Sequence, residues 1–214
     1  MVNTAATVHY FYDPLCGWCY GAAPLIEHLA ERKDIELVLH PGGLFNNRTI
    51  DQASRRHFLD SDQRIHALSG VIFSDAYLAK MRHANSVVLD SIVPIRAILA
   101  AGHCGKSALE MLKRIQIAHY QLGKTVHAPA VLAELAQAMG IDADVWHATF
   151  AATNEQDAIS ESIRQMMQYQ LQGYPSMMVE KQGKRQSVPV QSFFGKLDAW
   201  DDFLNRLSEN NGVQ

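Results

Sequence analysis

The stretch that decides the fold is residues 7–21, TVHYFYDPLCGWCYG. Its first six residues, Thr7–Tyr12, are β-branched, aromatic or His, and they predict a buried strand. From Tyr20 to Arg32 the apolar residues recur at helical spacing, which predicts a helix. Ile35–His40 predicts a second strand, which Pro41-Gly42-Gly43 ends. A strand, a helix and a strand in this order form a βαβ unit, so we expect two parallel strands joined by a right-handed crossover.

A long helical region follows this unit. Between about Asp51 and Gly173 the strand signal disappears, and the sequence predicts successive helices. Pro129 occupies a position typical of a first helical turn. Asn154, with Asp157 three residues later, resembles a capping box.

Strand character returns near the C-terminus, after Gly173-Tyr174-Pro175. Ser176–Lys181 and Arg185–Val190 flank the turn residues Gln182-Gly183-Lys184, which predicts a hairpin. A helix with one apolar stripe is expected over Lys196–Leu207. We therefore expect an α/β fold in which residues 1–50 and 160–214 form one domain around a single sheet. Residues 51–159 would be an all-helical insertion into that domain.

Composition narrows the class of protein. The chain has 214 residues, of which 48% are hydrophobic and 19% charged, as in ordinary soluble globular proteins. The formal net charge of −3, without a basic block, argues against nucleic-acid binding. No apolar run reaches the ~20 residues of a membrane helix. The N-terminus, Met1–Ala6, lacks the pattern of a secretory signal, so we expect a cytoplasmic protein.

Cys16 and Cys19, at a strand-to-helix junction, are the strongest chemical signal. Side chains three residues apart on a helix lie ~5–6 Å apart, close enough for a disulfide to form and break with little backbone movement. Free N–H groups at the helix start stabilise a thiolate, and cysteines in such settings have pKa values of ~3.5–7.5. We expect Cys16 to be the more exposed, attacking thiol and Cys19 the shielded, resolving thiol.

Other interpretations of this cysteine pair are a metal site or inert packing. A structural zinc site needs four ligands, and the sequence has no second Cys-x-x-Cys and no His at zinc-site spacing, so no metal is expected. Gly17 would let a substrate chain approach closely, and Trp18 would offer it a contact surface. Both are therefore predicted substrate-binding residues.

The run from Phe11 to Gly21, with its Cys-Gly-Trp-Cys pair, resembles the thioredoxin superfamily. Within it, the sequence is similar to DsbA-type thiol:disulfide oxidoreductases of the FrnE-related, predicted protein-disulfide isomerase group. The resemblance implies a thioredoxin-like fold with a large all-helical insertion of the DsbA type. It also implies that Pro24 is the proline that bends the active-site helix.

The resemblance assigns further residues to the site. Gly173-Tyr174-Pro175 is similar to the family's cis-proline loop, which lies beside the cysteine pair. Pro175 is thus expected to act with the two cysteines, and the Tyr174 backbone to pair with a bound peptide. Two features depart from the family: Gly17 stands where related proteins often carry Pro, and the first strand contains no acidic residue. Asp13, at the end of that strand, is the nearest carboxylate, and the proton-transfer residue stays unassigned.

Three functions are open at this stage. The first is a thiol:disulfide oxidoreductase or isomerase acting on protein or small-molecule disulfides and thiols. The second is a glutathione-dependent isomerase or transferase, since the 2-hydroxychromene-2-carboxylate isomerases and kappa-class transferases share the architecture but usually have Ser or a lone Cys. The third is a binding module in which the pair is structural. No bound cofactor is expected, with glutathione as a candidate redox partner. The direction of electron flow and the oligomeric state do not follow from the sequence.

Overall fold

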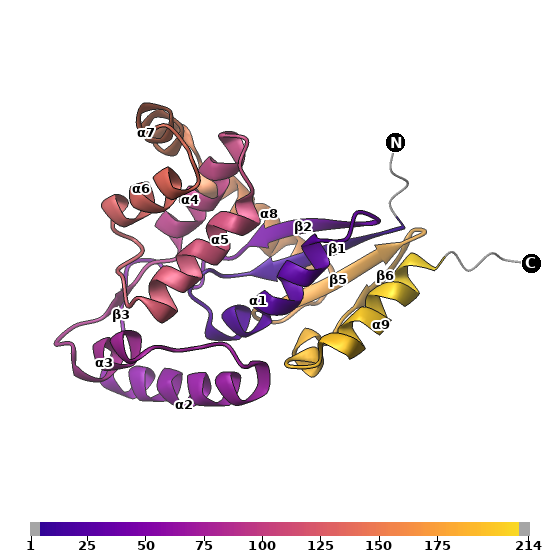
Figure 1. Cartoon of the computed structure of the whole chain (residues 1–214), viewed down its shortest axis with the longest axis horizontal. Helices are drawn as coiled ribbons and strands as arrows, with labels where there is room; N and C mark the ends of the chain where they lie inside the picture. Colours follow the sequence, from indigo (N-terminus) through magenta and orange to yellow (C-terminus); the bar gives the residue numbers. More distant parts are fainter. Residues whose placement is uncertain (1–4, 210–214) are drawn as a thin grey trace, which may run out of the picture.

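The computed structural model describes residues 5–209 of the chain (Figure 1). The strands are β1 (Ala6–Tyr12), β2 (Ile35–Pro41), β3 (Arg48–Thr49), β4 (Val88–Leu89), β5 (Ser176–Lys181) and β6 (Lys184–Ser187). The α-helices are α1 (Gly17–Ala30), α2 (Gln52–Ser69), α3 (Asp75–His83), α4 (Ile92–His103), α5 (Ala108–Gln116), α6 (Pro129–Ala138), α7 (Ala143–Ala152), α8 (Glu155–Gln168) and α9 (Leu197–Ser208). A π-helix, η1 (Ile117–Gln121), extends α5, and a 3₁₀-helix, η2 (Val190–Phe193), precedes α9.

A four-stranded sheet in the order β2-β1-β5-β6 forms the centre of the molecule. β1 pairs in parallel with β2, with Val8 opposite Leu37, and antiparallel with β5, with Val8 opposite Val179. The predicted βαβ unit is therefore confirmed. Because β5 joins β1 directly, the N-terminal and C-terminal segments complete one sheet, as expected.

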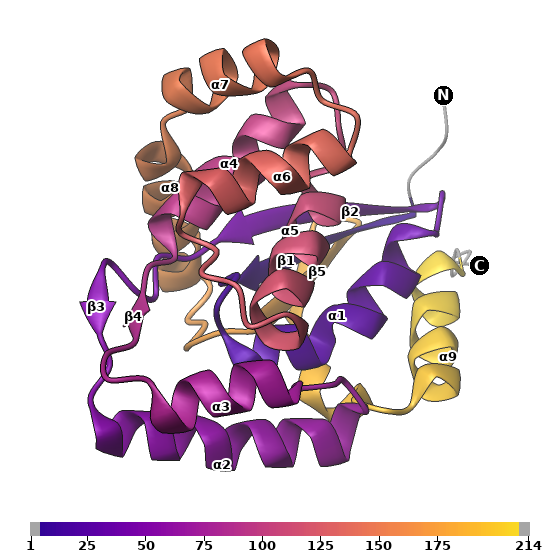
Figure 2. The same cartoon turned by 60° about the vertical axis from the view of Figure 1, so that its left-hand side comes forward.

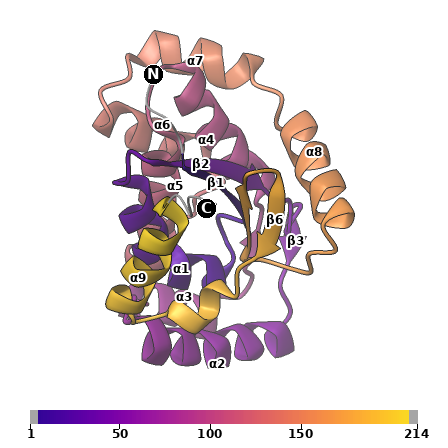
Figure 3. The ribbon, with the colours of Figure 1, turned by 90° about the vertical axis from the view of Figure 1, so that its right-hand side faces the viewer.

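Helices cover both faces of this sheet. α1 and α9 lie on one face, where the buried Trp200 of α9 donates a hydrogen bond to the Leu25 carbonyl of α1 at 2.9 Å. α8 lies on the opposite side of the sheet (Figure 3). There Met166 packs with Phe11 of β1 and Met178 of β5 in a small apolar cluster of its own. The alternation of side chains along β1 explains this division, since Val8, Tyr10 and Tyr12 belong to the larger core on the α1 face.

The helices between β2 and β5 form the insertion. α2 and α3 lie side by side across one end of the molecule (Figure 2). α4, α5, α6 and α7 pack against one another. None of the helices within residues 5–209 is long and apolar enough to span a membrane. The boundaries of the insertion at residues 51 and 159 stay a prediction. The expectation of a cytoplasmic protein depends on Met1–Ala6, and the first four of these residues lie outside the described part of the chain.

Two details of the sequence prediction are wrong. The region expected to be all helical contains β4, which pairs with β3 in a separate two-stranded sheet and is continued by a hydrogen bond from Ile50 N–H to Val87 O at 2.8 Å. The second strand of the hairpin ends at Ser187 rather than Val190. Pro189 has no N–H to donate to a neighbouring strand, and Val190 begins η2.

Candidate active site

The site begins where β1 ends and α1 starts. Cys16 is the N-cap residue of α1, with extended backbone angles of φ −82° and ψ 116°. Its carbonyl accepts the first helical hydrogen bond, from Tyr20 N–H at 3.0 Å, while its side chain makes no capping bond. The sulfur of Cys16 is thus free of a capping role at the end of the helix where the N–H groups lack intrahelical partners.

The two cysteines lie close together and are both free thiols. They come within 3.3 Å of each other. Cys16 is 7% exposed and Cys19 is fully buried, so Cys16 is the more exposed of the two, although it is itself a buried residue. Burial, and next the neighbouring Cys16, raise the pKa of Cys19 well above its usual value. Cys19 therefore needs a proton acceptor nearby before it can attack a disulfide.

The loop before β5 forms one wall beside Cys16. The Tyr174–Pro175 peptide bond is cis, as the resemblance implied. The thiol of Cys16 donates a hydrogen bond to the Tyr174 carbonyl at 3.4 Å. The Tyr174 ring lies against Gly42, where a Cβ would collide with the ring. The structure thus brings together Cys16, Cys19, Tyr174 and Pro175 from segments about 160 residues apart in the chain.

Asp13 is the buried acid that the sequence left unassigned. Its side chain is fully buried, and its backbone N–H contacts the sulfur of Cys19 at 3.5 Å. Oδ1 accepts hydrogen bonds from Leu15 N–H at 2.9 Å and from the Ser91 hydroxyl at 2.8 Å, and Oδ2 accepts one from Leu44 N–H at 2.8 Å. Burial raises the pKa of Asp13 to about 6, against the lowering effect of these three donors.

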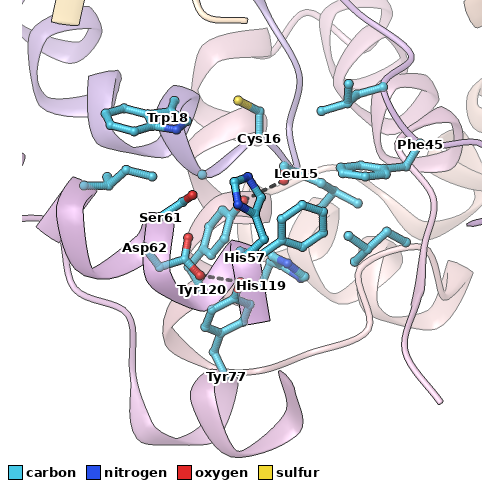
Figure 4. Close-up of a pocket in the computed structure, with 15 residues that line it drawn as sticks. Leu15, Cys16, Trp18, Phe45, His57, Ser61, Asp62, Tyr77, His119 and Tyr120 are labelled. Carbon is cyan, nitrogen blue, oxygen red and sulfur yellow. Dashed lines mark hydrogen bonds between the residues drawn. The ribbon is translucent and has the colours of Figure 1, made fainter. Parts of the chain in front are cut away.

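A pocket of about 150 Å³ opens beside Cys16, between α1, α2, α3 and η1 (Figure 4). Gly17 and Trp18 both line it. The small size of Gly17 serves contact with α2, since a Cβ at this position would lie 2.9 Å from Oδ1 of Asp62 and 3.1 Å from the Ile65 side chain. The Trp18 ring is partly buried and stacks on Phe194, with ring centroids 6.3 Å apart. The apolar walls come mainly from Leu15, Leu44, Phe45, Phe58, Ile65 and Leu89.

The floor of this pocket holds polar groups that the sequence analysis did not find. The Tyr77 hydroxyl donates a hydrogen bond to Oδ2 of Asp62 at 2.9 Å, and burial raises the pKa of Asp62 to about 7. Burial lowers the pKa of His119 to about 3. The π-helix η1 presents His119 and Tyr120 to the pocket, and the Tyr120 hydroxyl donates to the Leu15 carbonyl at 2.7 Å. Such π-helical segments are frequent at functional sites.

The sequence contained a sign that Asp62 is a buried carboxylate. On α2 it stands four residues after Phe58 and three before Ile65, so a carboxylate occupies a position on the apolar side of the helix. The contacts of Asp13 with Leu44 and Ser91 had no such signal. Among residues 5–209, no group of three or more His, Cys, Asp or Glu side chains is arranged to hold a metal ion.

A cysteine at the N-cap position of a helix, a second cysteine one turn deeper and an adjacent cis-proline loop on this sheet define a dithiol protein of the thioredoxin fold. A family model for the DSBA-like thioredoxin domain matches residues 7–207. The chain therefore belongs to the DsbA-like thioredoxin-domain family, a family of disulfide oxidoreductases, and has that family's helical insertion.

Solved structures of similar proteins support the same assignment. The cytosolic disulfide reductase DsbM from Pseudomonas aeruginosa is 33% identical, with a TM-score of 0.86 over 94% of this chain and 97% of that one. A structure of DsbM with GSH matches with 33% identity and a TM-score of 0.84 over 94% and 98% of the two chains.

More distant structures share the fold. A candidate protein disulfide isomerase from Nitrosomonas europaea is 21% identical, with a TM-score of 0.74 over 92% and 98% of the two chains. A 2-hydroxychromene-2-carboxylate isomerase is 16% identical, with a TM-score of 0.58 over 94% and 96%. A search of curated protein sequences gave no match.

Proposed function

We propose that this protein is a cytosolic disulfide reductase that exchanges disulfides through Cys16 and Cys19 and takes its electrons from glutathione. The observation that carries the proposal is the arrangement of the two thiols, 3.3 Å apart, with Cys16 in the pocket lining and Cys19 fully buried. The similarity to DsbM, a cytosolic disulfide reductase seen with GSH, supports both the reduction of substrate disulfides and glutathione as the electron donor.

The reaction follows from the geometry in two steps. The Cys16 thiolate attacks a substrate disulfide, a mixed disulfide forms on Cys16, and the first substrate thiolate leaves and takes a proton from solvent. Cys19 then loses its proton, attacks the sulfur of Cys16 and releases the second substrate thiolate. Two glutathione molecules reduce the resulting Cys16–Cys19 disulfide: the first forms a mixed disulfide with Cys16, and the second releases oxidised glutathione.

Four further groups have proposed roles in these steps. Asp13 accepts the proton of Cys19: its backbone N–H contacts that sulfur, its charge helps to raise the pKa of Cys19, and its own pKa of about 6 makes it mostly ionised at neutral pH. The Tyr174 carbonyl, which already contacts Cys16, and Pro175 position the substrate chain next to the attacking sulfur. Trp18, partly exposed at the pocket, contacts the substrate.

The test is reduction of insulin disulfides with glutathione as the electron donor. We expect the wild type to accelerate the reaction, and the Cys16→Ser variant to be inactive. The Cys19→Ser variant should accumulate a mixed disulfide with insulin on a non-reducing gel. Cys104→Ser is the matched control, since Cys104 lies away from the site at the end of α4. A Cys16→Ser variant as active as the wild type would contradict the proposal, and a fully active Cys19→Ala variant would favour a glutathione-dependent isomerase instead.

A further inference from the structure

One carboxyl group on the floor of the pocket has an oxygen without a partner. Asp62 is 4% exposed, and Tyr77 donates to its Oδ2. Its other oxygen, Oδ1, accepts no hydrogen bond from any group within residues 5–209. Oδ1 lies directly against Gly17, since a Cβ there would be 2.9 Å away. Asp62 lines the pocket together with Cys16 (Figure 4), and Oδ1 is its oxygen without a protein donor in the described part of the chain.

The buried groups that face Asp62 offer it no positive charge. Burial raises the pKa values of Tyr77 on α3 and Tyr120 on η1, so both are neutral phenols. Burial lowers the pKa of His119 on η1 to about 3, so this imidazole is neutral as well. The remaining titratable groups in the pocket lining are Cys16 on α1 and the exposed His57 on α2. A cationic partner stabilises a buried carboxylate, and a cation on a ligand would fill that place here.

The size of the pocket limits what that ligand can be. Its volume of about 150 Å³ is roughly ten times the ~10–15 Å³ that one buried water needs, which suits a short aliphatic chain rather than a folded protein segment. Apolar side chains form much of its wall, and Cys16 is one of its lining residues. A molecule with a sulfur at one end, a few methylene groups and a cation at the other end matches this arrangement.

We propose that the pocket binds the primary ammonium group of a small aliphatic disulfide whose sulfur is attacked by the Cys16 thiolate, and that Asp62 recognises this group. The proposal rests on the proposed function and specifies the small-molecule substrate class. In the reaction the Cys16 thiolate attacks one sulfur of the disulfide, a mixed disulfide forms, and the aminothiolate leaves and takes a proton from solvent. The ammonium of the half that stays attached to Cys16 lies at Oδ1 of Asp62.

The test compares two disulfides of similar size on the reduced protein. Cystamine carries an ammonium group at each end, and 2-hydroxyethyl disulfide carries hydroxyl groups instead. The rate constant for oxidation of the protein is measured with each probe by mass spectrometry, and their ratio is compared between variants. We expect Asp62→Asn to lower the cystamine to hydroxyethyl ratio by about tenfold, because it removes a charge-assisted hydrogen bond. Asp60→Asn is the matched control on the exposed face of the same helix and should keep the wild-type ratio.

The pH dependence gives a second readout. The wild-type ratio should rise between about pH 6 and pH 8, as Asp62, with a pKa of about 7, ionises. The ratio in Asp62→Asn should stay flat over this range. Changes in the ionisation of Cys16 affect both probes and cancel in the ratio.

Gly17→Ala provides an independent variant in case Asp62→Asn does not fold. A methyl group on Gly17 would push Oδ1 of Asp62 aside and should also lower the ratio. A wild-type ratio retained in Asp62→Asn, or in Gly17→Ala if only that variant folds, would overturn the proposal. If the wild type reacts with neither disulfide, the proposed disulfide exchange at Cys16 fails instead.

Discussion

Replacing Asp13 with Asn tests whether ionisation of this buried carboxyl group lowers the stability of the folded protein. Burial raises its pKa from 3.8 to about 6. A raised pKa means that the folded state favours the protonated form. The contribution of Asp13 to stability is therefore fully present below pH 3.8 and is lost as the pH rises through about 6.

The magnitude follows from that rise in pKa. At 1.36 kcal/mol per pKa unit, a change from 3.8 to about 6 corresponds to about 3 kcal/mol. Asp13 is fully buried, so solvent does not screen this effect. Asn cannot ionise, but it presents an amide NH₂ to one of the three donors around the carboxyl group. That mismatch lowers stability by a constant ~1–3 kcal/mol at every pH.

The assay is urea unfolding of both proteins at several values between pH 4 and pH 7.5. The free energy of unfolding of Asp13→Asn minus that of the wild type should increase by about 2 kcal/mol across this range, because part of the effect is already lost at pH 4. Other carboxyl groups, including Asp62, are common to both proteins and cancel in the difference. A difference that does not change with pH would refute the reasoning, because it would mean that Asp13 has an ordinary pKa in the folded protein.

Two further predictions concern neighbouring contacts. Gly42→Ala should slow disulfide exchange by about ten- to a hundred-fold, because the added Cβ collides with the Tyr174 ring and displaces the carbonyl beside Cys16. The rate of oxidation is measured by stopped flow, and an unchanged rate would count against a role for Tyr174. Tyr120→Phe should lower the free energy of unfolding by about 1–3 kcal/mol, because the buried Leu15 carbonyl loses its 2.7 Å hydrogen bond; urea unfolding with no measurable change would contradict this.

The sequence was sufficient to predict elements that are set by local residue patterns. The β-branched and aromatic residues of Thr7–Tyr12 and the helical spacing after Cys19 predicted β1, α1 and their order with β2. These segments are long and periodic, and their neighbours in the sheet are close in sequence. The cis bond at Pro175 was also predicted, but only through the family resemblance, since most X-Pro bonds are trans.

The sequence was insufficient where distant segments meet. β4 has two residues, and its pairing with β3 depends on a contact across about 40 positions rather than on a periodic pattern. The surroundings of Asp13 include Leu44 and Ser91, which are 31 and 78 positions away in the sequence and meet it only in the folded structure. Asp62 occupies an apolar position of α2, but its link to Gly17 exists only in three dimensions.

The most direct test of the account is a redox titration of the cysteine pair in glutathione buffers of varied poise. Free thiols are alkylated at each point, and mass spectrometry identifies the modified residues. If Cys16 and Cys19 form a reversible disulfide, we expect them to lose alkylation together along one two-electron curve, while Cys104 stays reactive. Cysteines that titrate independently, or a pair that stays alkylated in fully oxidised glutathione, would contradict it.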